Sequence, residues 1–149
     1  MKLNFKSYNF TTKQEQGNTL IFDIIRKGYF VLTPEEWVRQ HVLCYLVEDI
    51  GVPKGLISVE RAFHFNGLQK RFDVVVANSK GELELLIECK APYVNLDNKV
   101  LHQAGIYQKN LGVKKIFLTN GIQHVFLQWN PIKNGFEQIS SLAPYSTWF

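Results

Sequence analysis

Two acidic residues and a lysine stand at the ends of two apolar runs. Asp73 opens a β-branched run that reaches Val76, and Glu88 and Lys90 close a run that begins at Leu85. Residues two apart in a strand share a face, with Cα atoms roughly 6.6 Å apart, so Glu88 and Lys90 are able to share one site. Charged side chains are seldom buried without a partner, and Asp is disfavoured inside strands. A surface salt bridge at a strand end explains the Glu88 and Lys90 spacing equally well.

The loop between these runs brings the two acids together. Its sequence, Asn-Ser-Lys-Gly at 78–81, is typical of a tight hairpin turn. A hairpin there places Asp73 and Glu88 at about the same level, although a slip of one residue would turn either acid to the other face. Adjacent carboxylates need a proton or cation between them, and Mg²⁺ prefers carboxylate oxygens. With Lys90 beside the ion, the three residues indicate a metal-dependent phosphodiester hydrolase site, with Mn²⁺ as a substitute ion.

The elements that position these residues follow from periodicity and from turn residues. Thr33 supplies an N-cap hydroxyl, Pro34 stands at N1, and Glu36 at N3 completes the pattern of a capping box. A helix is therefore predicted from Thr33 to about Asp49. The other predicted elements are strands at 56–65, 69–77 and 82–90, a helix at 96–111, strands at 114–119 and 124–129, and an edge strand within 135–149.

This order predicts an α/β fold in which helices flank a mixed sheet. We expect one domain over 1–149, with an N-terminal extension at 1–32 that forms a short strand or hairpin. The core is expected at 33–130, and an edge strand and tail at 131–149, with the end at Trp148 and Phe149 packed back on the domain.

Composition narrows the function classes further. The 149 residues carry 17 Lys and Arg against 13 Asp and Glu, a net charge of +4 that permits a polyanionic partner without identifying one. Cys44 and Cys89 are isolated, so neither a disulfide framework nor a cysteine zinc site is expected. No apolar run reaches the roughly 20 residues of a membrane span, and no signal peptide is recognised. We expect a cytoplasmic protein without a membrane partner.

Four ordered segments resemble a known family. Arg-Phe-Asp at 71–73 and Ile-Glu-Cys-Lys-Ala-Pro at 87–92 look like the PD-(D/E)XK nuclease superfamily, with Phe72 where the superfamily name has Pro. The segment 32–40, the Glu-Cys-Lys-Ala-Pro run, the pair Gln103 and Tyr107, and the segment 118–121 together resemble the N-terminal nuclease domain of type I restriction enzyme R subunits. The resemblance covers most of 30–130 and implies a restriction-endonuclease-like αβββαβ sandwich.

The resemblance also implies a role for each site residue. It assigns Mg²⁺ binding to Asp73, Glu88 and the backbone carbonyl of Cys89, and metal support to Glu36. It assigns water positioning or charge stabilisation to Lys90, and contact with the scissile strand to Gln103. Glu36 is equally explained by its capping role, with Glu35 as the neighbouring alternative for metal support, and Gln103 by ordinary helix solvation.

The leading hypothesis is a Mg²⁺-dependent DNA endonuclease that works with other restriction-modification subunits. The chain has no G-x-x-x-x-G-K-[ST] phosphate loop, so DNA translocation would have to come from another polypeptide. An inactive module of the same fold that binds DNA or a partner protein is the main alternative, and a domain without any nucleic-acid role is a third. Five basic residues are candidates for phosphate contact: Lys54, Lys70, Arg71, Lys99 and Lys109.

Overall fold

The computed structural model describes residues 2–149, with only the backbone described at 100 and 101. The strands are β1 Thr12–Glu15, β2 Asn18–Asp23, β3 Gly28–Val31, β4 Ile57–Phe65, β5 Leu68–Ala77, β6 Leu83–Cys89, β7 Lys115–Thr119, β8 His124–Asn130 and β9 Gly135–Ile139. The α-helices are α1 Pro34–Cys44 and α2 Val100–Leu111, and the shorter turns are a π-helical turn Tyr45–Ile50 and 3₁₀ turns Lys54–Leu56 and Tyr145–Thr147.

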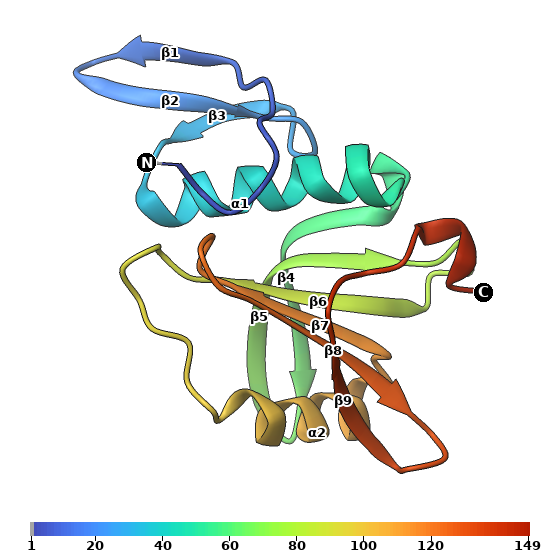
Figure 1. Ribbon diagram of the computed structural model, residues 1–149. Coiled ribbons are helices and arrows are strands. Elements are labelled where there is room, and N and C mark those ends of the chain that lie inside the picture. The colour runs from blue at the N-terminus through green and yellow to red at the C-terminus, as the bar shows by residue number, and fades with distance from the viewer. Residues whose placement is uncertain (1) are drawn as a thin grey trace.

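Two sheets and two α-helices make the predicted α/β sandwich. The large sheet has the order β4-β5-β6-β7-β8-β9, with β6 and β7 parallel and every other neighbouring pair antiparallel. Strands β1, β2 and β3 form a separate antiparallel sheet. Helix α1 lies between the small sheet and one face of the large sheet, and α2 lies on the opposite side (Figure 1). The mixed sheet flanked by helices confirms the predicted fold class.

Helix α1 begins as its sequence predicts, with one correction. The Thr33 hydroxyl accepts the backbone N–H of Glu36 at 3.0 Å, and Pro34 occupies the first turn. The second half of the capping box is wrong, because the Thr33 N–H donates to the Val31 carbonyl at 3.0 Å. This leaves the Glu36 carboxylate for other partners. The helix then passes into the π-helical turn, which ends at Gly51 with a φ of 81°.

Helix α2 starts later than its sequence pattern suggests. The prediction placed its first residue at Leu96, whereas the structure begins the helix at Val100. Asp97 accepts the backbone N–H of Lys99 at 3.0 Å, which is a local turn in place of a helical hydrogen bond. The four residues before the helix therefore belong to the connection from β6.

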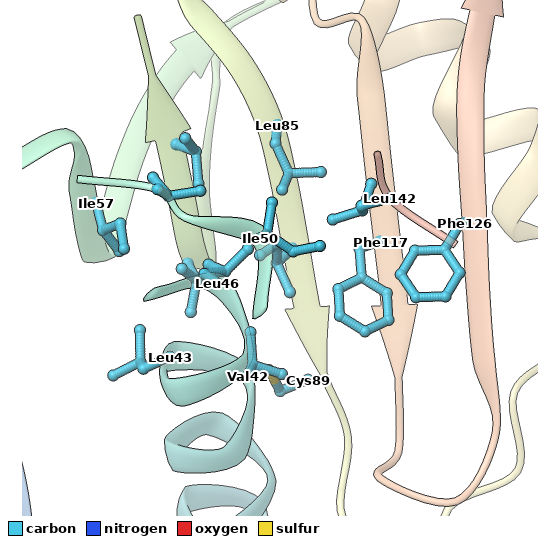
Figure 2. Close-up of a cluster of buried hydrophobic side chains, with 14 of the residues drawn as sticks. Val42, Leu43, Leu46, Ile50, Ile57, Leu85, Cys89, Phe117, Phe126 and Leu142 are labelled. Atoms are coloured by element: carbon cyan, nitrogen blue, oxygen red, sulfur yellow. The ribbon is translucent and has the colours of Figure 1, made fainter. Parts of the chain in front are cut away.

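The core consists of one cluster on each face of the large sheet. Val42 and Leu46 on the α1 side meet Leu85 and Cys89 of β6, and Phe117 stacks on Phe126 with ring centroids 4.3 Å apart (Figure 2). On the α2 side the buried members are Phe72, Val75, Leu86, Ala104, Tyr107, Val113, Ile116 and Leu127. Alternation along β6 fixes which side chains face which helix.

That alternation breaks in β5 at Asp73. Val74 and Val76 belong to the α1 side, and Val75 belongs to the α2 side. Phe72 should then join Val74, yet it packs on the α2 side with its ring centroid 5.1 Å from that of Tyr107. On the neighbouring strand Glu60 has a φ of +57°, which is rare for a residue with a side chain. The outer part of the β4–β5 hairpin consequently extends toward α2 (Figure 1).

The two ends of the chain also pack against the core. The predicted C-terminal edge strand is β9, and the Trp148 indole donates to the Ala143 carbonyl at 2.9 Å while its ring lies 4.5 Å from the Lys115 ammonium.

Among the helices that the structure describes, none has the length and apolar character needed to cross a membrane.

Candidate active site

A hollow of about 190 Å³ opens where β6 ends, on the side of the sheet that α2 covers. Its wall is formed by Lys70, Glu88, Lys90, Asn95, Leu96, Asp97, Lys99, Gln103 and Leu118. The structure thus brings together Glu88, Lys90 and Gln103, three of the site residues predicted from the sequence. Lys70 and Lys99, two of the lysines predicted to contact phosphate, line the same hollow. The connection from β6 to α2 supplies Asn95, Leu96 and Asp97, and β7 supplies Leu118.

Glu88 is the acid of this hollow, and its carboxylate is already engaged. Its Oε1 lies 3.3 Å from the Lys70 Nζ and accepts the Tyr107 hydroxyl at 3.4 Å. Burial raises the pKa of Tyr107 to about 12, with a further contribution from the charge of Glu88 and from the hydrogen bond between them. Tyr107 is therefore a permanent donor to Glu88 near neutral pH and is not suited to act as a base.

Asp73 lies beside the hollow without lining it. Its Oδ2 accepts the Cys89 N–H at 2.7 Å, and its Oδ1 accepts the Arg39 Nη2 at 3.2 Å. The β5–β6 ladder ends at the pair Val74 and Ile87, so Asp73 stands opposite Glu88 one step beyond it. The Asp73 carboxylate thus accepts the Cys89 N–H, which a backbone carbonyl of β5 would accept if the ladder continued. The two acids are thus held at one level of the sheet by neighbouring strands.

Lys90 lines the hollow and also interacts electrostatically with Glu35. Burial raises the pKa of Glu35, the charge of Asp73 raises it further, and Arg39 and Lys90 act in the opposite direction. The ammonium of Lys90 therefore lies within electrostatic range of Glu35 on α1 while it also lines the hollow beside Glu88. This exposed lysine therefore lies near Glu88 and within electrostatic range of Glu35.

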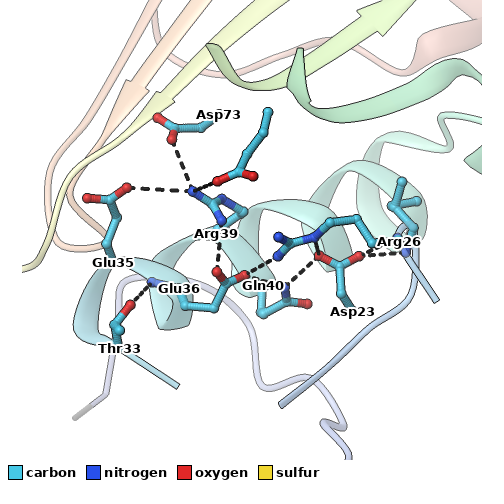
Figure 3. Close-up of polar contacts among 10 residues, drawn as sticks. Asp23, Arg26, Thr33, Glu35, Glu36, Arg39, Gln40 and Asp73 are labelled. Carbon is cyan, nitrogen blue, oxygen red and sulfur yellow. Dashed lines mark hydrogen bonds and ion pairs between the residues drawn. The ribbon is translucent and has the colours of Figure 1, made fainter. Parts of the chain in front are cut away.

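Arg39 organises the carboxylates on the α1 side (Figure 3). Only 7% of its side chain is exposed, and its guanidinium contacts four acids: Glu36 at 2.8 Å, Asp73 at 3.2 Å, Glu35 at 3.6 Å and Glu60 at 3.8 Å. This charge balance allows so many acids to lie close together, because a buried charge without a partner is strongly unfavourable.

Glu36 is bound within that network and does not line the hollow. Its carboxylate accepts Arg26 at 2.7 Å, Gln40 at 2.8 Å and Arg39 at 2.8 Å (Figure 3). Arg26 and Gln40 also donate to Asp23 at the end of β2. Glu36 thus links the small sheet to Arg39 and, through Arg39, to Asp73.

Most of the residues that form the site fall within one family match. The sequence profile of the family described as type I restriction enzyme R protein N terminus matches residues 34–143. The chain belongs to this family. The match extends from the first residue of α1 to beyond β9, and it confirms the relationship that the four ordered segments suggested. No curated protein matches the chain at a significant level.

In this type I restriction enzyme R protein N-terminal domain, the donor chemistry suits Mg²⁺ in kind. Magnesium is commonly held by one or two carboxylates, with water and phosphate oxygens in its other positions. Across residues 2–149 as described, no three His, Cys, Asp or Glu side chains gather in a way that could hold a metal ion. Side-chain ligation would therefore rest on Asp73 and Glu88, with the Cys89 carbonyl as the backbone contribution.

The roles of Tyr107 and Arg39 were not predicted from the sequence, and Lys70 was predicted only as a phosphate contact. Tyr107 follows Gln103 by one helical turn, so their shared face was a usable signal. Arg39 follows Glu35 and Glu36 at spacings of four and three, which also predicts contact on a helix. The contact of Lys70 with Glu88 had no such signal, because it depends on how the β4–β5 hairpin bends.

Proposed function

We propose that this domain is a Mg²⁺-dependent DNA endonuclease of the PD-(D/E)XK superfamily that hydrolyses phosphodiester bonds. The observation that carries the proposal is the junction of β5 and β6. There Asp73 is hydrogen-bonded to the peptide that follows Glu88, and Glu88 shares its hollow with Lys90 and Gln103. Two carboxylates with a neighbouring lysine form a donor set that suits metal-assisted hydrolysis.

Each residue has a role that follows from its position. Asp73, Glu88 and the Cys89 carbonyl would hold the ion, which when bound supplies Lewis acidity and lowers the pKa of a coordinated water. Lys90 presents an ammonium next to Glu88, where it can orient the attacking water and stabilise developing negative charge.

Two helices add supporting groups. Gln103 reaches the hollow from α2 and can donate to a phosphate of the scissile strand. Glu35 is better placed than Glu36 to support the metal from α1, because Glu36 is bound to three donors whereas Glu35 is about half exposed and interacts with both Asp73 and Lys90.

The substrate class follows from the charges at the hollow. Lys70, Lys90 and Lys99 all line it, and phosphate contacts by lysine supply the sequence-independent part of DNA affinity. Membership in the family favours assembly with the other subunits of a restriction-modification complex. DNA and those subunits are the proposed partners.

The proposal is tested by nicking of supercoiled plasmid in Mg²⁺ or Mn²⁺. Lys90→Ala should reduce the rate by about 100-fold or more, the usual effect of removing one preorganised charge stabiliser. Lys80→Ala is the matched control, since Lys80 is an exposed lysine in the β5–β6 turn at the far end of β6. Cleavage by Lys90→Ala at the rate of the control would overturn the proposal.

A catalytically inactive DNA-binding module is the second candidate, and one observation favours it. Both acids already have a cation, Arg39 on Asp73 and Lys70 on Glu88, so the pair is stable without a metal ion. Salt-dependent DNA binding without nicking across Mg²⁺ and Mn²⁺ titrations would support this candidate.

A further inference from the structure

We propose that Lys70 is an exchangeable counter-ion of the site. It neutralises Glu88 while no metal is bound, and it moves to a DNA phosphate when a divalent ion takes its place on Glu88. This inference rests on the proposed function, because it assumes that Glu88 is a metal ligand. It adds that metal loading prepares the DNA-binding surface.

The contact between Lys70 and Glu88 has the geometry of an internal substitute for a cation. Lys70 Nζ lies 3.3 Å from Glu88 Oε1, and both side chains line the same hollow. Tyr107 donates to that same oxygen at 3.4 Å, so the carboxylate is held in place whether or not the lysine stays. A metal ion that binds this oxygen must therefore compete with the positive charge of Lys70.

The two cations of the site differ in how easily they can leave. Arg39 contacts four carboxylates and is 7% exposed, so removing it would disrupt four ion pairs and leave Asp73 without its cation. Lys70 contacts one carboxylate and is 40% exposed. A lysine also carries a flexible stem and a compact charge with rotatable donors. Lys70 is therefore the cation that exchanges, and Arg39 is the one that stays.

The released lysine has a destination within reach. Lys90 and Lys99 line the same hollow, so a phosphate near Glu88 would meet three ammonium groups once Lys70 is free. While Lys70 is paired with Glu88, that carboxylate largely neutralises its charge. The contribution of Lys70 to DNA binding should consequently appear only when a divalent ion is present.

The first arm of the test is a calorimetric titration of the whole 149-residue protein with Mn²⁺ in the absence of DNA. Lys70→Gln should bind Mn²⁺ about fivefold tighter or more, because a unit charge about 4 Å away changes a binding constant by that factor even when it is fully hydrated. Lys70→Arg keeps the charge and should bind as the wild type does. Lys80→Gln is the matched control, and thermal melting verifies that each variant is folded.

The second arm measures binding of a short DNA duplex with and without Ca²⁺, which replaces Mg²⁺ to limit cleavage. With Ca²⁺, Lys70→Gln should bind DNA more weakly, and the slope of log K against log salt should fall by about one. Without a divalent ion, Lys70→Gln should match the wild type. A loss of equal size in both conditions would show that Lys70 contacts phosphate permanently and would overturn the exchange.

Glu88→Gln separates failure of this inference from failure of the proposed function. If Glu88→Gln loses Mn²⁺ binding while Lys70→Gln binds as the wild type does, the exchange is wrong and the metal site stands. If Glu88→Gln binds Mn²⁺ as tightly as the wild type, or the wild type binds none, both proposals fail. Tighter binding by Lys70→Gln that is absent in Lys80→Gln supports the exchange.

Discussion

Arg39 is a buried cation that balances the charges of four nearby carboxylates. Its guanidinium balances Glu36 and Asp73 at hydrogen-bond distance, with Glu35 and Glu60 slightly farther away. Because Asp73 also accepts the Cys89 N–H, the position of this carboxylate is set from both sides. The catalytic proposal depends on that fixed position, although Arg39 does not line the hollow.

Removal of Arg39 should therefore destabilise the folded protein. Arg39→Met is expected to lower the free energy of unfolding by about 3 kcal/mol, because it leaves Asp73 without its cation, while Glu36 keeps its ion pair with Arg26. Urea denaturation measures the change. Arg71→Met, which removes an exposed arginine two positions before Asp73, should stay within about 0.5 kcal/mol of the wild type. Similar losses in the two variants would contradict the role assigned to Arg39.

Glu35 gives a pH-dependent prediction whose sign can be worked out. The folded protein raises the pKa of Glu35 through burial and the charge of Asp73, so folding favours the protonated form. The stability from this group is present below the unfolded pKa of about 4.3 and is lost as pH rises through the folded value. Glu35→Gln should melt at a higher temperature than wild type at pH 7–8, with the difference vanishing near pH 3.

Thermal melting from pH 3 to pH 8 measures this difference directly. The effect should be modest, since the Glu35 side chain is 48% exposed and is screened by solvent. A difference of the same size at both ends of the range would contradict the electrostatic origin.

The residues of the site could be predicted from sequence to different extents. Alternation alone placed Glu88 and Lys90 on one face, and both line the hollow. The role of Glu36 depends on Arg26 and Asp23, which come from the N-terminal sheet, and no local pattern links that sheet to α1. Long-range charge pairs of this kind leave no signal at fixed spacing.

At the level of elements, the strands and helices were predictable wherever local turn chemistry and periodicity agreed. The hairpin loop at 78–81 fixed the pairing of β5 with β6, and Thr33 marked the start of α1. The break of alternation at Asp73 was not predictable. It arises because Phe72 packs against Tyr107 of α2, a contact between segments that are distant in the chain.

The start of α1 supports a quantitative prediction. Thr33→Ala should lower the free energy of unfolding by about 1 kcal/mol, because the Glu36 N–H loses its side-chain acceptor. Thr33→Ser keeps the hydroxyl and should remain close to the wild type. Chemical denaturation of the two variants provides the measurement, and equal stability of Thr33→Ala and Thr33→Ser would show that the cap contributes nothing.

For the whole molecule, the site lies where three parts of the fold meet. The N-terminal sheet secures α1 through Arg26, α1 holds Asp73 through Arg39, and the β6–α2 connection closes the hollow around Glu88. That connection is itself tied to the sheet, since the Asn120 amide donates to the Val94 carbonyl at 2.9 Å. In this arrangement Lys70 is the more exposed of the two cations that contact Asp73 and Glu88.

The proposed hydrolysis requires that Asp73 and Glu88 share one divalent ion. Anomalous scattering from a crystal soaked in Mn²⁺ measures this directly. We predict a peak bonded to one oxygen of each carboxylate at about 2.0–2.2 Å, and loss of that peak in Glu88→Gln. Manganese bound only at other surfaces, or bound to Glu88 while Asp73 remains out of reach, would contradict the account.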